Sequence, residues 1–322
     1  MAVTGVGEPK RQGAAAEREG GPAAISLRDV VKVYDTTTAV DGLDLEVPVG
    51  VCLGLLGPNG AGKSTTMRML TAQTRATSGA IEVLGLPIPA RAKRARALMG
   101  VVPQEDNLDE ELSARENLEV FARLYRVPRG ERAAAVRRAL ELAQLVDRQD
   151  VRADKLSGGM RRRLLIARGL VHGPRLVLLD EPTVGLDPQV RQELWSLIAR
   201  LRDEGVTVLM STHYIEEAER LADEVAIMSG GRVVARGVPA DLIAEHAGER
   251  AVEHLTAPAA RAEIERLAAE HGVPTRRTGP ALSLLHAEKL PAELRARLDG
   301  AAVHRASTLE DVFVLLTGED VG

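Results

Sequence analysis

A glycine-rich segment at residues 57–64 has the composition of a phosphate-binding loop. It reads Gly-Pro-Asn-Gly-Ala-Gly-Lys-Ser and fits the pattern G-x-x-x-x-G-K-[ST]. The glycines let backbone N–H groups turn inward around phosphate oxygens, and a helix that follows adds its positive N-terminus. Lys63 would then reach the β- and γ-phosphates, and Ser64 could ligate Mg²⁺. A chance glycine-rich turn is the alternative, but a strand expected before the segment and a helix expected after it favour a nucleotide site.

Two adjacent carboxylates end an apolar run at residues 176–181, which reads Leu-Val-Leu-Leu-Asp-Glu. A buried strand that ends in this way places Asp180 at the C-terminal edge of a sheet, where it can hold Mg²⁺ through water. Glu181 is one residue further and is positioned to polarise an attacking water. The pattern is common when it stands alone. After a phosphate-binding loop, it indicates nucleotide hydrolysis.

A third segment, residues 156–160, reads Leu-Ser-Gly-Gly-Met. A Ser-Gly-Gly turn that opens a helix is a second anion-binding device, because free N–H groups and the helix dipole face one point. A simple helix N-cap by Ser157 is the alternative interpretation. A phosphate-binding loop alone fits many classes of nucleotide hydrolase, and this second anion-binding segment reduces the number of classes that fit.

Together these segments resemble the motif set of the ATP-binding-cassette (ABC) family, in the family's order, over residues 24–236. The resemblance implies an α/β fold, a P-loop NTPase cassette with a mostly parallel sheet and an antiparallel N-terminal β part. It also implies a helical insert at about residues 112–170, counting the signature helix. By the same resemblance, Gln104 lies in the Q-loop, Asp187 lies in the D-loop, and His213 is the switch histidine.

The resemblance also assigns a role to each candidate site residue. Tyr34 falls where the family stacks an aromatic ring on adenine, with a core tyrosine as the alternative. His213 alone would more often be structural, but its place after an apolar run favours the switch role. The implied catalytic residues are Lys63, Gln104, Glu181 and His213, and the implied Mg²⁺ ligands are Ser64, Gln104 and Asp180. The implied ATP contacts are Tyr34, Gly57, Pro58, Asn59, Gly60, Ala61, Gly62, Lys63, Ser64, Thr65, Ser157, Gly158, Gly159 and Asp187. Met160 replaces the family's usual final glutamine, which puts any role of that side chain in doubt.

The elements that must position these residues follow from hydrophobic periodicity. Strands alternate with helices, which predicts a mostly parallel sheet covered on both faces. Asp29 is the one break in the alternation of the first strand, and Ser113 with Glu116 has capping-box spacing. We expect strands at residues 24–34, 43–47, 51–56, 176–179 and 206–210, and helices at 62–72, 188–204 and, interrupted at 127–130, 112–145.

The sequence changes character after residue 236 and predicts a small α+β domain at residues 237–322. The order strand, helix, strand, helix, strand, with an extra strand near 275–278, fits a split β-α-β unit. Ser307 and Glu310 have capping-box spacing before a last helix at residues 309–316. Residues 1–23 are rich in Gly, Ala, Arg and Glu, and we expect a disordered tail there. The expected domains are therefore 24–236 and 237–322.

Composition limits the classes of function. Among the 322 residues, lysine and arginine total 42 against 46 acidic residues, a formal net charge of −4, which gives no support to a nucleic-acid partner. The single cysteine, Cys52, favours a reducing compartment, and its apolar neighbours predict a buried strand residue. No stretch approaches the ~18 apolar residues of a membrane helix, and the first 24 residues lack the apolar core of a signal peptide. We therefore expect a cytoplasmic protein that is peripheral on the inner face of the cell membrane through a partner.

The family resemblance implies two partners. One is a second copy of the chain, with each ATP held between one copy's phosphate loop and the other's signature; the other is an integral membrane permease. Residues 104–109 and 309–313 resemble the branch of daunorubicin-resistance and nodulation-factor exporter ATPases, which implies a type-2 export permease and a drug, antibiotic, lipid-like or oligosaccharide cargo. An ABC ATPase of translation or DNA repair is the alternative, and a regulatory module that uses ATP only to dimerise is a third. The single cassette and the intact Glu181 argue against these two classes.

Overall fold

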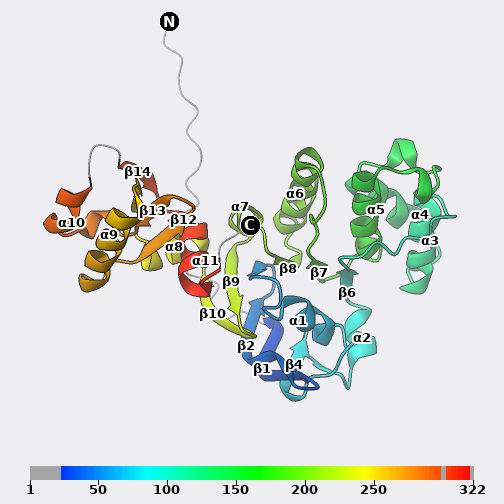
Figure 1. Cartoon of the computed structure of the whole chain (residues 1–322). Coiled ribbons are helices and arrows are strands. Elements are labelled where there is room, and N and C mark those ends of the chain that lie inside the picture. Colours follow the sequence, from blue (N-terminus) through cyan, green and yellow to red (C-terminus); the bar gives the residue numbers. More distant parts are fainter. Residues whose placement is uncertain (1–22, 299–301, 320–322) are drawn as a thin grey trace, which may run out of the picture.

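The computed structural model describes residues 23–298 and 302–319. The expected disordered tail at residues 1–23 therefore lies outside the described residues, except for Ala23, which begins the first strand. The described chain forms three sheets and eleven α-helices. Figure 1 shows the C-terminal sheet and the three helices within residues 114–170 on opposite sides of a central body.

An antiparallel sheet forms the N-terminal part, as the family resemblance implied. Its strands are β1 (Ala23–Tyr34), β2 (Thr37–Pro48), β4 (Ser78–Val83) and β5 (Leu86–Ile88), in the order β2-β1-β4-β5. Asp29 breaks the alternation of β1 because it has a positive φ of 47° and lies at a register shift between Leu27 and Val30. A short helix, α2 (Ala92–Arg96), follows β5.

A six-stranded sheet forms the centre, with the order β10-β9-β3-β8-β7-β6. The strands from β9 to β6 in this order are parallel, and only β10 is antiparallel to its neighbour, so the prediction of a mostly parallel sheet is confirmed. The strands are β3 (Cys52–Leu56), β6 (Met99–Val102), β7 (Leu176–Asp180), β8 (Thr207–Thr212), β9 (Glu224–Ser229) and β10 (Arg232–Gly237). Cys52 is buried in β3, as predicted, and burial raises the pKa of its thiol to about 12.

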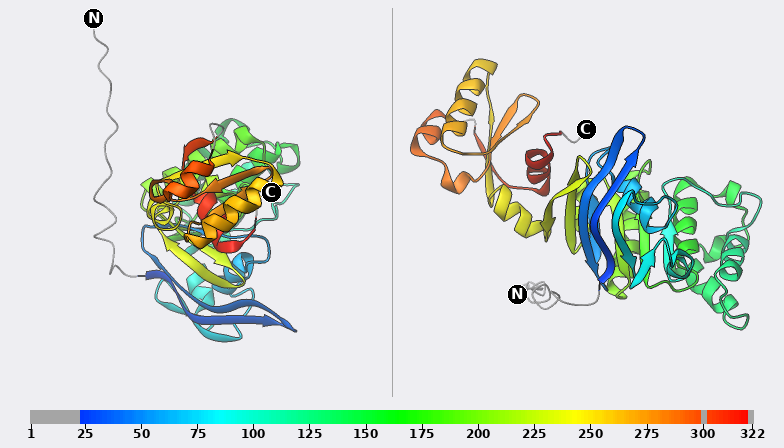
Figure 2. Two further views of the ribbon diagram at one scale, coloured as in Figure 1. Left: turned by 60° about the vertical axis from the view of Figure 1, so that its left-hand side comes forward. Right: turned by 90° about the horizontal axis from the view of Figure 1, so that it is seen from below.

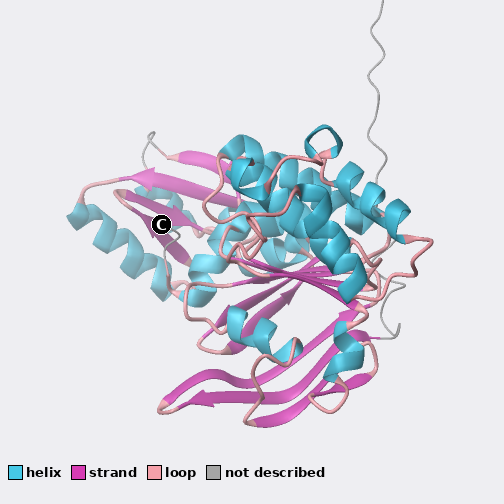
Figure 3. Cartoon of the chain, turned by 90° about the vertical axis from the view of Figure 1, so that its right-hand side faces the viewer, coloured by secondary structure: helices cyan, strands magenta, loops and turns pink. Residues whose placement is uncertain are grey.

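Alternate side chains of these parallel strands fill two hydrophobic cores, because successive residues of a strand point to opposite faces. Leu53, Leu55 and Leu178 face α1 (Lys63–Leu70) and the N-terminal sheet. Cys52, Val177 and Leu179 face the other way, toward α5 (Gly158–Leu170) and α6 (Pro188–Asp203). Figure 3 shows the central sheet nearly edge-on between these two layers.

The expected helical insert is present as α3 (Ala114–Leu124) and α4 (Arg132–Leu142), followed by α5. Ser113 and Glu116 form the predicted capping box at the start of α3: the Glu116 N–H donates to Ser113 Oγ, and the Ser113 N–H donates to Glu116 Oε2. The interruption expected at residues 127–130 separates α3 from α4. These helices share one apolar core with α6 and the central sheet.

The C-terminal part contains a third, antiparallel sheet in the order β12-β13-β11-β14. Along the chain the elements are α8 (Pro239–His246), β11 (Arg250–Leu255), α9 (Pro258–Glu270), β12 (Thr275–Thr278), β13 (Ala281–Leu284), α10 (Ala292–Arg297) and β14 (Val303–Ala306). From β11 onward this is the β-α-β-β-α-β order of a split β-α-β unit, so the predicted element order is confirmed.

The last helix, α11 (Leu309–Thr317), lies between the C-terminal sheet and the central body (Figure 2, right). Its buried side chains Leu309, Val312 and Phe313 pack with residues of α7 (Ile215–Leu221) and of β9. The predicted cap by Ser307 and Glu310 is wrong: the cap is Thr308, whose N–H donates to Asp311 Oδ2, while Ser307 Oγ donates to the Ala247 carbonyl. Among the described helices, none is both long and apolar enough to cross a bilayer.

Candidate functional site

The glycine-rich segment forms a turn between β3 and α1, the context that the motif requires. Gly62 has a φ of 103°, and a Cβ added there would lie 2.5 Å from the Ala39 carbonyl oxygen, so only glycine fits. Lys63 follows and is buried. Its Nζ donates to the carbonyls of Gly57 at 2.6 Å and Pro58 at 2.9 Å. Burial lowers the pKa of Lys63 from its ordinary value, although nearby Glu181 and Asp180 oppose the shift.

Asp180 ends β7 beside the phosphate loop. Ser64 Oγ donates to Asp180 Oδ1 at 3.3 Å, and Ser211 Oγ, on the adjacent strand β8, donates to the same oxygen at 2.5 Å. Within the described residues, no group of three or more His, Cys, Asp or Glu side chains could hold a metal. A hydroxyl and one carboxylate fit Mg²⁺, which keeps several waters and completes its shell with phosphate oxygens.

Glu181 is buried and receives contacts from three separate segments. The side-chain amide of Gln104 donates to Glu181 Oε2 at 3.1 Å, and Lys63 Nζ lies 3.8 Å from Oε1. His213 Nδ1 lies 3.3 Å from Oε1, although it makes no hydrogen bond of acceptable geometry. The structure therefore brings together the four residues expected to be catalytic.

Tyr34 lies at the turn between β1 and β2 and is 40% exposed, so it is a surface residue and the core alternative is wrong. Its hydroxyl donates to Thr74 Oγ1 at 3.5 Å, just beyond α1, and Lys32 Nζ lies 4.4 Å from the ring centre. An exposed face of this ring is free to stack on a flat ligand.

The signature turn opens α5, away from the phosphate loop (Figure 1). Ser157 is the N-cap, and its Oγ accepts the Met160 N–H at 3.3 Å. Gly158 is exposed and a Cβ added to it would meet no other segment within 4 Å, whereas a Cβ on Gly159 would lie 2.5 Å from Val190 of α6. Asp187, the N-cap residue of α6, is also exposed. Among the described residues, no hydrogen bond or ion pair joins Ser157, Gly158 or Gly159 to the phosphate loop.

The sequence interpretation missed Ser211. Its hydroxyl holds Asp180, and it also accepts the backbone N–H of Glu181 at 3.0 Å. Its position was a usable signal, because a hydroxyl at the end of a buried parallel strand meets the neighbouring strand's last side chain.

Comparisons with known proteins agree with this geometry. A family model described as ABC transporter matches residues 40–184. The chain is 43% identical to the Nod factor export ATP-binding protein I of Rhizobium meliloti, over 92% of this chain and 89% of the relative. It is 44% identical to the protein of the same name from Paraburkholderia xenovorans, over 93% of this chain and 98% of the relative.

Solved structures give the same picture. A dimeric bacterial ABC transporter cassette is 28% identical, with a TM-score of 0.61, over 66% of this chain and 98% of that chain. A second structure of that cassette, a dimer in a post-hydrolysis state bound to ADP and phosphate, is 27% identical with a TM-score of 0.60 over the same shares of the two chains. The cbiO1 protein of Clostridium perfringens, part of the ABC transporter complex cbiONQ, is 27% identical with a TM-score of 0.64, over 77% of this chain and 95% of that chain.

Proposed function

Since this chain belongs to the ABC transporter family and is an export ATPase subunit, we propose that it hydrolyses ATP beside Glu181, where the phosphate loop, the Q-loop and the switch histidine meet. The single observation that carries this proposal is the environment of the Glu181 carboxylate, which Gln104, Lys63 and His213 approach from three segments. Such convergence orients a carboxylate toward one reacting water.

Each residue then has a defined role at the nucleotide. Backbone N–H groups of Gly57 and of residues 59–65 surround the phosphates, and Lys63 turns from its own loop carbonyls to the β- and γ-phosphates. Tyr34 stacks on adenine. Ser64, Asp180 and Gln104 hold Mg²⁺, which neutralises charge on the phosphates. Glu181 accepts a proton from the attacking water, and His213 contacts the γ-phosphate.

The signature acts on a second copy of the chain. Ser157, Gly158 and Gly159 lie away from their own phosphate loop, so their free N–H groups are available to an ATP bound by another molecule. The dimeric cassettes among the similar structures support this arrangement. ATP then closes the pair, and hydrolysis reopens it.

The membrane partner we propose is a separate permease of the type-2 export class, docked on the helical insert at about residues 112–145. The chain would then be cytoplasmic and peripheral on the inner face of the membrane, with a nucleotide domain at 24–236 and an accessory domain at 237–322. The relatives are named for Nod factor export, which supports export as the direction of transport. Their names give no support to translation or DNA repair. The cargo we propose is a drug, an antibiotic or a lipid-like or oligosaccharide molecule.

The test is the Glu181→Gln variant of the full chain, compared with Glu245→Gln, an exposed carboxylate on α8. Without its general base, the first variant should hydrolyse Mg-ATP about 10²-fold more slowly or worse. It should also shift from monomer to dimer by light scattering when Mg-ATP is added, whereas the control should hydrolyse like the native chain. Undiminished hydrolysis by Glu181→Gln would contradict the catalytic assignment. A monomeric mass at saturating Mg-ATP would contradict the assignment of the signature to a second copy.

A further inference from the structure

Arg162 lies in α5, two residues beyond the signature, and is 9% exposed. Its guanidinium donates five hydrogen bonds, and every acceptor is a backbone carbonyl. The acceptors are Pro182 at 2.6 Å, Pro103 at 2.9 Å, Gln104 at 3.0 Å, Glu181 at 3.1 Å and Asp180 at 3.3 Å. These carbonyls belong to two segments, the Q-loop and the end of β7, which are about 80 residues apart in the sequence.

Only arginine suits this position. Its planar guanidinium has five N–H donors in a fixed fork and remains charged, whereas a lysine has three donors at one point. Burial lowers the pKa of Arg162, and the negative charges of Asp106, Asp180 and Glu217 oppose that shift. Within the described chain it forms no ion pair, so the five carbonyl oxygens contact the buried charge directly and the three carboxylates act on it from a distance. Breaking this set would leave polar groups unsatisfied, which makes the arrangement rigid.

The anchored carbonyls belong to the residues that carry the chemistry. Gln104 donates its side-chain amide to Glu181, and Arg162 binds the backbone of both residues. Glu181 also has a positive φ of 45°, a conformation that a residue other than glycine keeps only when its surroundings impose it. Arg162 binds this turn through its carbonyls, while Ser211 binds it through the Glu181 N–H.

We propose that Arg162 is a positioning residue that fixes Glu181 and Gln104 from the signature helix of the same chain. This role of Arg162 rests on the paired arrangement of the proposed function, and it connects the two ATP sites of the pair. In each copy, the helix that presents Ser157 to the partner's ATP also holds the carboxylate that acts on its own ATP. Arg162 touches neither nucleotide, so its effect should appear in kcat and not in ATP affinity.

The neighbouring Arg163 provides a matched control. It is on the same helix and its side chain is only 11% exposed, but its partners are the side chains of Gln144 and Glu193, outside the site. Arg162→Lys should fold, keep KM within threefold and lose at least tenfold in kcat, because small displacements of reacting groups are costly to rate. Arg163→Lys should keep kcat within twofold. Equal kcat losses in the two variants, with equal losses in thermal stability, would overturn the proposal.

Mixed pairs separate positioning from a general structural role. Two differently tagged chains are co-purified so that only one copy keeps Glu181. When Arg162→Lys is in the copy that keeps Glu181, hydrolysis should fall at least tenfold relative to the same pair with native Arg162. When Arg162→Lys is instead in the Glu181→Gln copy, hydrolysis should stay within twofold. Equal losses in both pairs would mean that the variant only disturbs α5, and no loss in either would refute the proposal.

Failure of the paired arrangement can be recognised independently. The Glu181→Gln chain with native Arg162 either dimerises with Mg-ATP or does not. If it does not, the paired cassettes of the proposed function are refuted, while the kcat of Arg162→Lys in the unmixed chain still decides whether Arg162 positions Glu181.

Discussion

Ser211 donates its hydroxyl proton to Asp180 Oδ1 across 2.5 Å, linking the ends of two adjacent parallel strands. Ser211 Oγ also accepts the backbone N–H of Glu181. One buried hydroxyl thus holds the proposed Mg²⁺ ligand and the proposed general base in a fixed relation. Strand pairing between β7 and β8 alone would place the backbones but not the carboxylate.

Replacing Ser211 with alanine removes both of these hydrogen bonds and leaves a buried N–H with one acceptor fewer. We expect a loss of about 1–2 kcal/mol in the free energy of unfolding, and a larger relative loss in kcat than in KM. Urea denaturation and steady-state hydrolysis measure the two effects. Ser196→Ala, which removes an exposed hydroxyl bonded within α6, should change neither. An unchanged kcat in Ser211→Ala would contradict the role assigned to this hydroxyl.

The two signature glycines should differ in their tolerance of a methyl group. A Cβ on Gly159 would meet Val190 at 2.5 Å, whereas a Cβ on Gly158 would meet nothing within 4 Å. We expect Gly159→Ala to lower the melting temperature and Gly158→Ala to leave it unchanged or raise it, because alanine favours the helix.

Adding Val190→Ala to Gly159→Ala tests the cause. If the contact with Val190 is responsible, the double variant loses less stability than the sum of the losses in Gly159→Ala and Val190→Ala. Strictly additive losses in this cycle would show that the contact is not the reason for glycine at this position.

Local motifs predicted the geometry of the phosphate loop and of the signature turn, because each of these is a short segment. Residues 57–64 and 156–160 each carry their own turn, helix start and glycine pattern, so their geometry is set within a few residues. Strand order then follows from the parallel sheet, which brings the ends of β3, β7 and β8 to one edge. The motifs and this strand order together are enough to predict that Lys63 and Glu181 lie close to each other.

Contacts between distant segments could not be read from the sequence. The five acceptors of Arg162 are backbone carbonyls, which every residue has, so no sequence pattern marks them. The predicted strand at residues 206–210 ended at the last apolar residue, but β8 continues through Ser211 and Thr212, whose burial no apolar pattern indicates. The cap at α11 was misplaced by one residue because both Ser307 with Glu310 and Thr308 with Asp311 have suitable side chains at that spacing. The structure has the cap of Thr308 with Asp311, and Asp311 also binds Arg276 and Arg305 of the C-terminal sheet.

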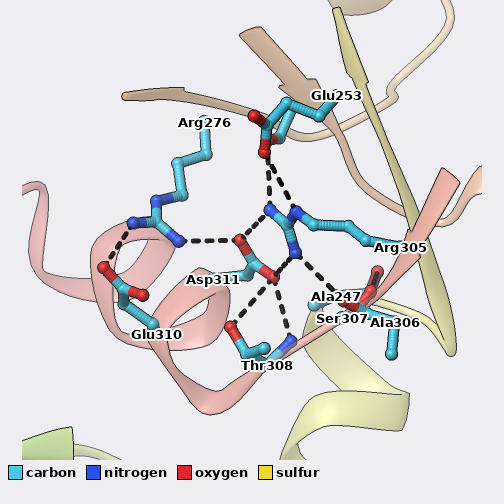
Figure 4. Close-up of polar contacts among 10 residues, drawn as sticks. Ala247, Glu253, Arg276, Arg305, Ala306, Ser307, Thr308, Glu310 and Asp311 are labelled. Atoms are coloured by element: carbon cyan, nitrogen blue, oxygen red, sulfur yellow. Dashed lines mark hydrogen bonds and ion pairs between the residues drawn. The ribbon is translucent and has the colours of Figure 1, made fainter. Parts of the chain in front are cut away.

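Asp311 is fully buried at the centre of an ionic cluster between α11 and the C-terminal sheet (Figure 4). It accepts hydrogen bonds from Arg305 at 2.7 Å to each oxygen and from Arg276 at 2.9 Å. Arg276 also donates to Glu310, and Arg305 donates to Glu253. Because β11, β12 and β14 all contribute to this cluster, it fixes α11 to the sheet.

Replacement of Asp311 should therefore strongly lower the free energy of unfolding. Asp311→Ala leaves two guanidinium groups without their shared carboxylate, and we expect a loss of about 3–5 kcal/mol in the free energy of unfolding. Glu310→Ala removes a carboxylate that is 42% exposed from the same cluster and should cost no more than about 1 kcal/mol. Similar losses in the two variants, measured by urea denaturation, would contradict a central role for Asp311.

We also expect the stability of the fold to depend on pH through Asp311. Burial acts to raise the pKa of Asp311, but hydrogen bonds from Arg305, Thr308 and Arg276 outweigh it and lower the pKa below its ordinary value of 3.8. The unfolded chain therefore takes up this proton first, so the stabilisation is complete above about pH 4 and is lost as the pH falls through the folded pKa. Asp311→Asn should lack this part of the acid dependence. Parallel acid curves for the native and Asn chains would refute the assignment.

Glu217 shows the opposite shift and provides the last prediction. It is fully buried in α7, four residues beyond His213, and accepts the indole N–H of Trp195 at 3.3 Å. Burial raises the pKa of Glu217, and the hydroxyls of Thr212 and Thr183, the indole N–H and the charge of Arg191 only partly offset this. A raised pKa means that stabilisation is complete below the unfolded value of about 4.5 and is lost as the pH rises through the folded pKa.

Glu217→Gln keeps an acceptor for the indole but cannot ionise. We therefore expect this variant to be at least as stable as the native chain at pH 8, with an advantage that shrinks toward pH 5. Glu217→Ala should instead lose about 2–4 kcal/mol, because it leaves a cavity and an unpaired indole N–H. Trp195 is the only tryptophan in the chain, so its fluorescence follows unfolding and reports this contact directly. Glu216→Gln, on the exposed side of α7, is the control. If native stability does not fall relative to Glu217→Gln between pH 5 and 8, the raised pKa of Glu217 is refuted.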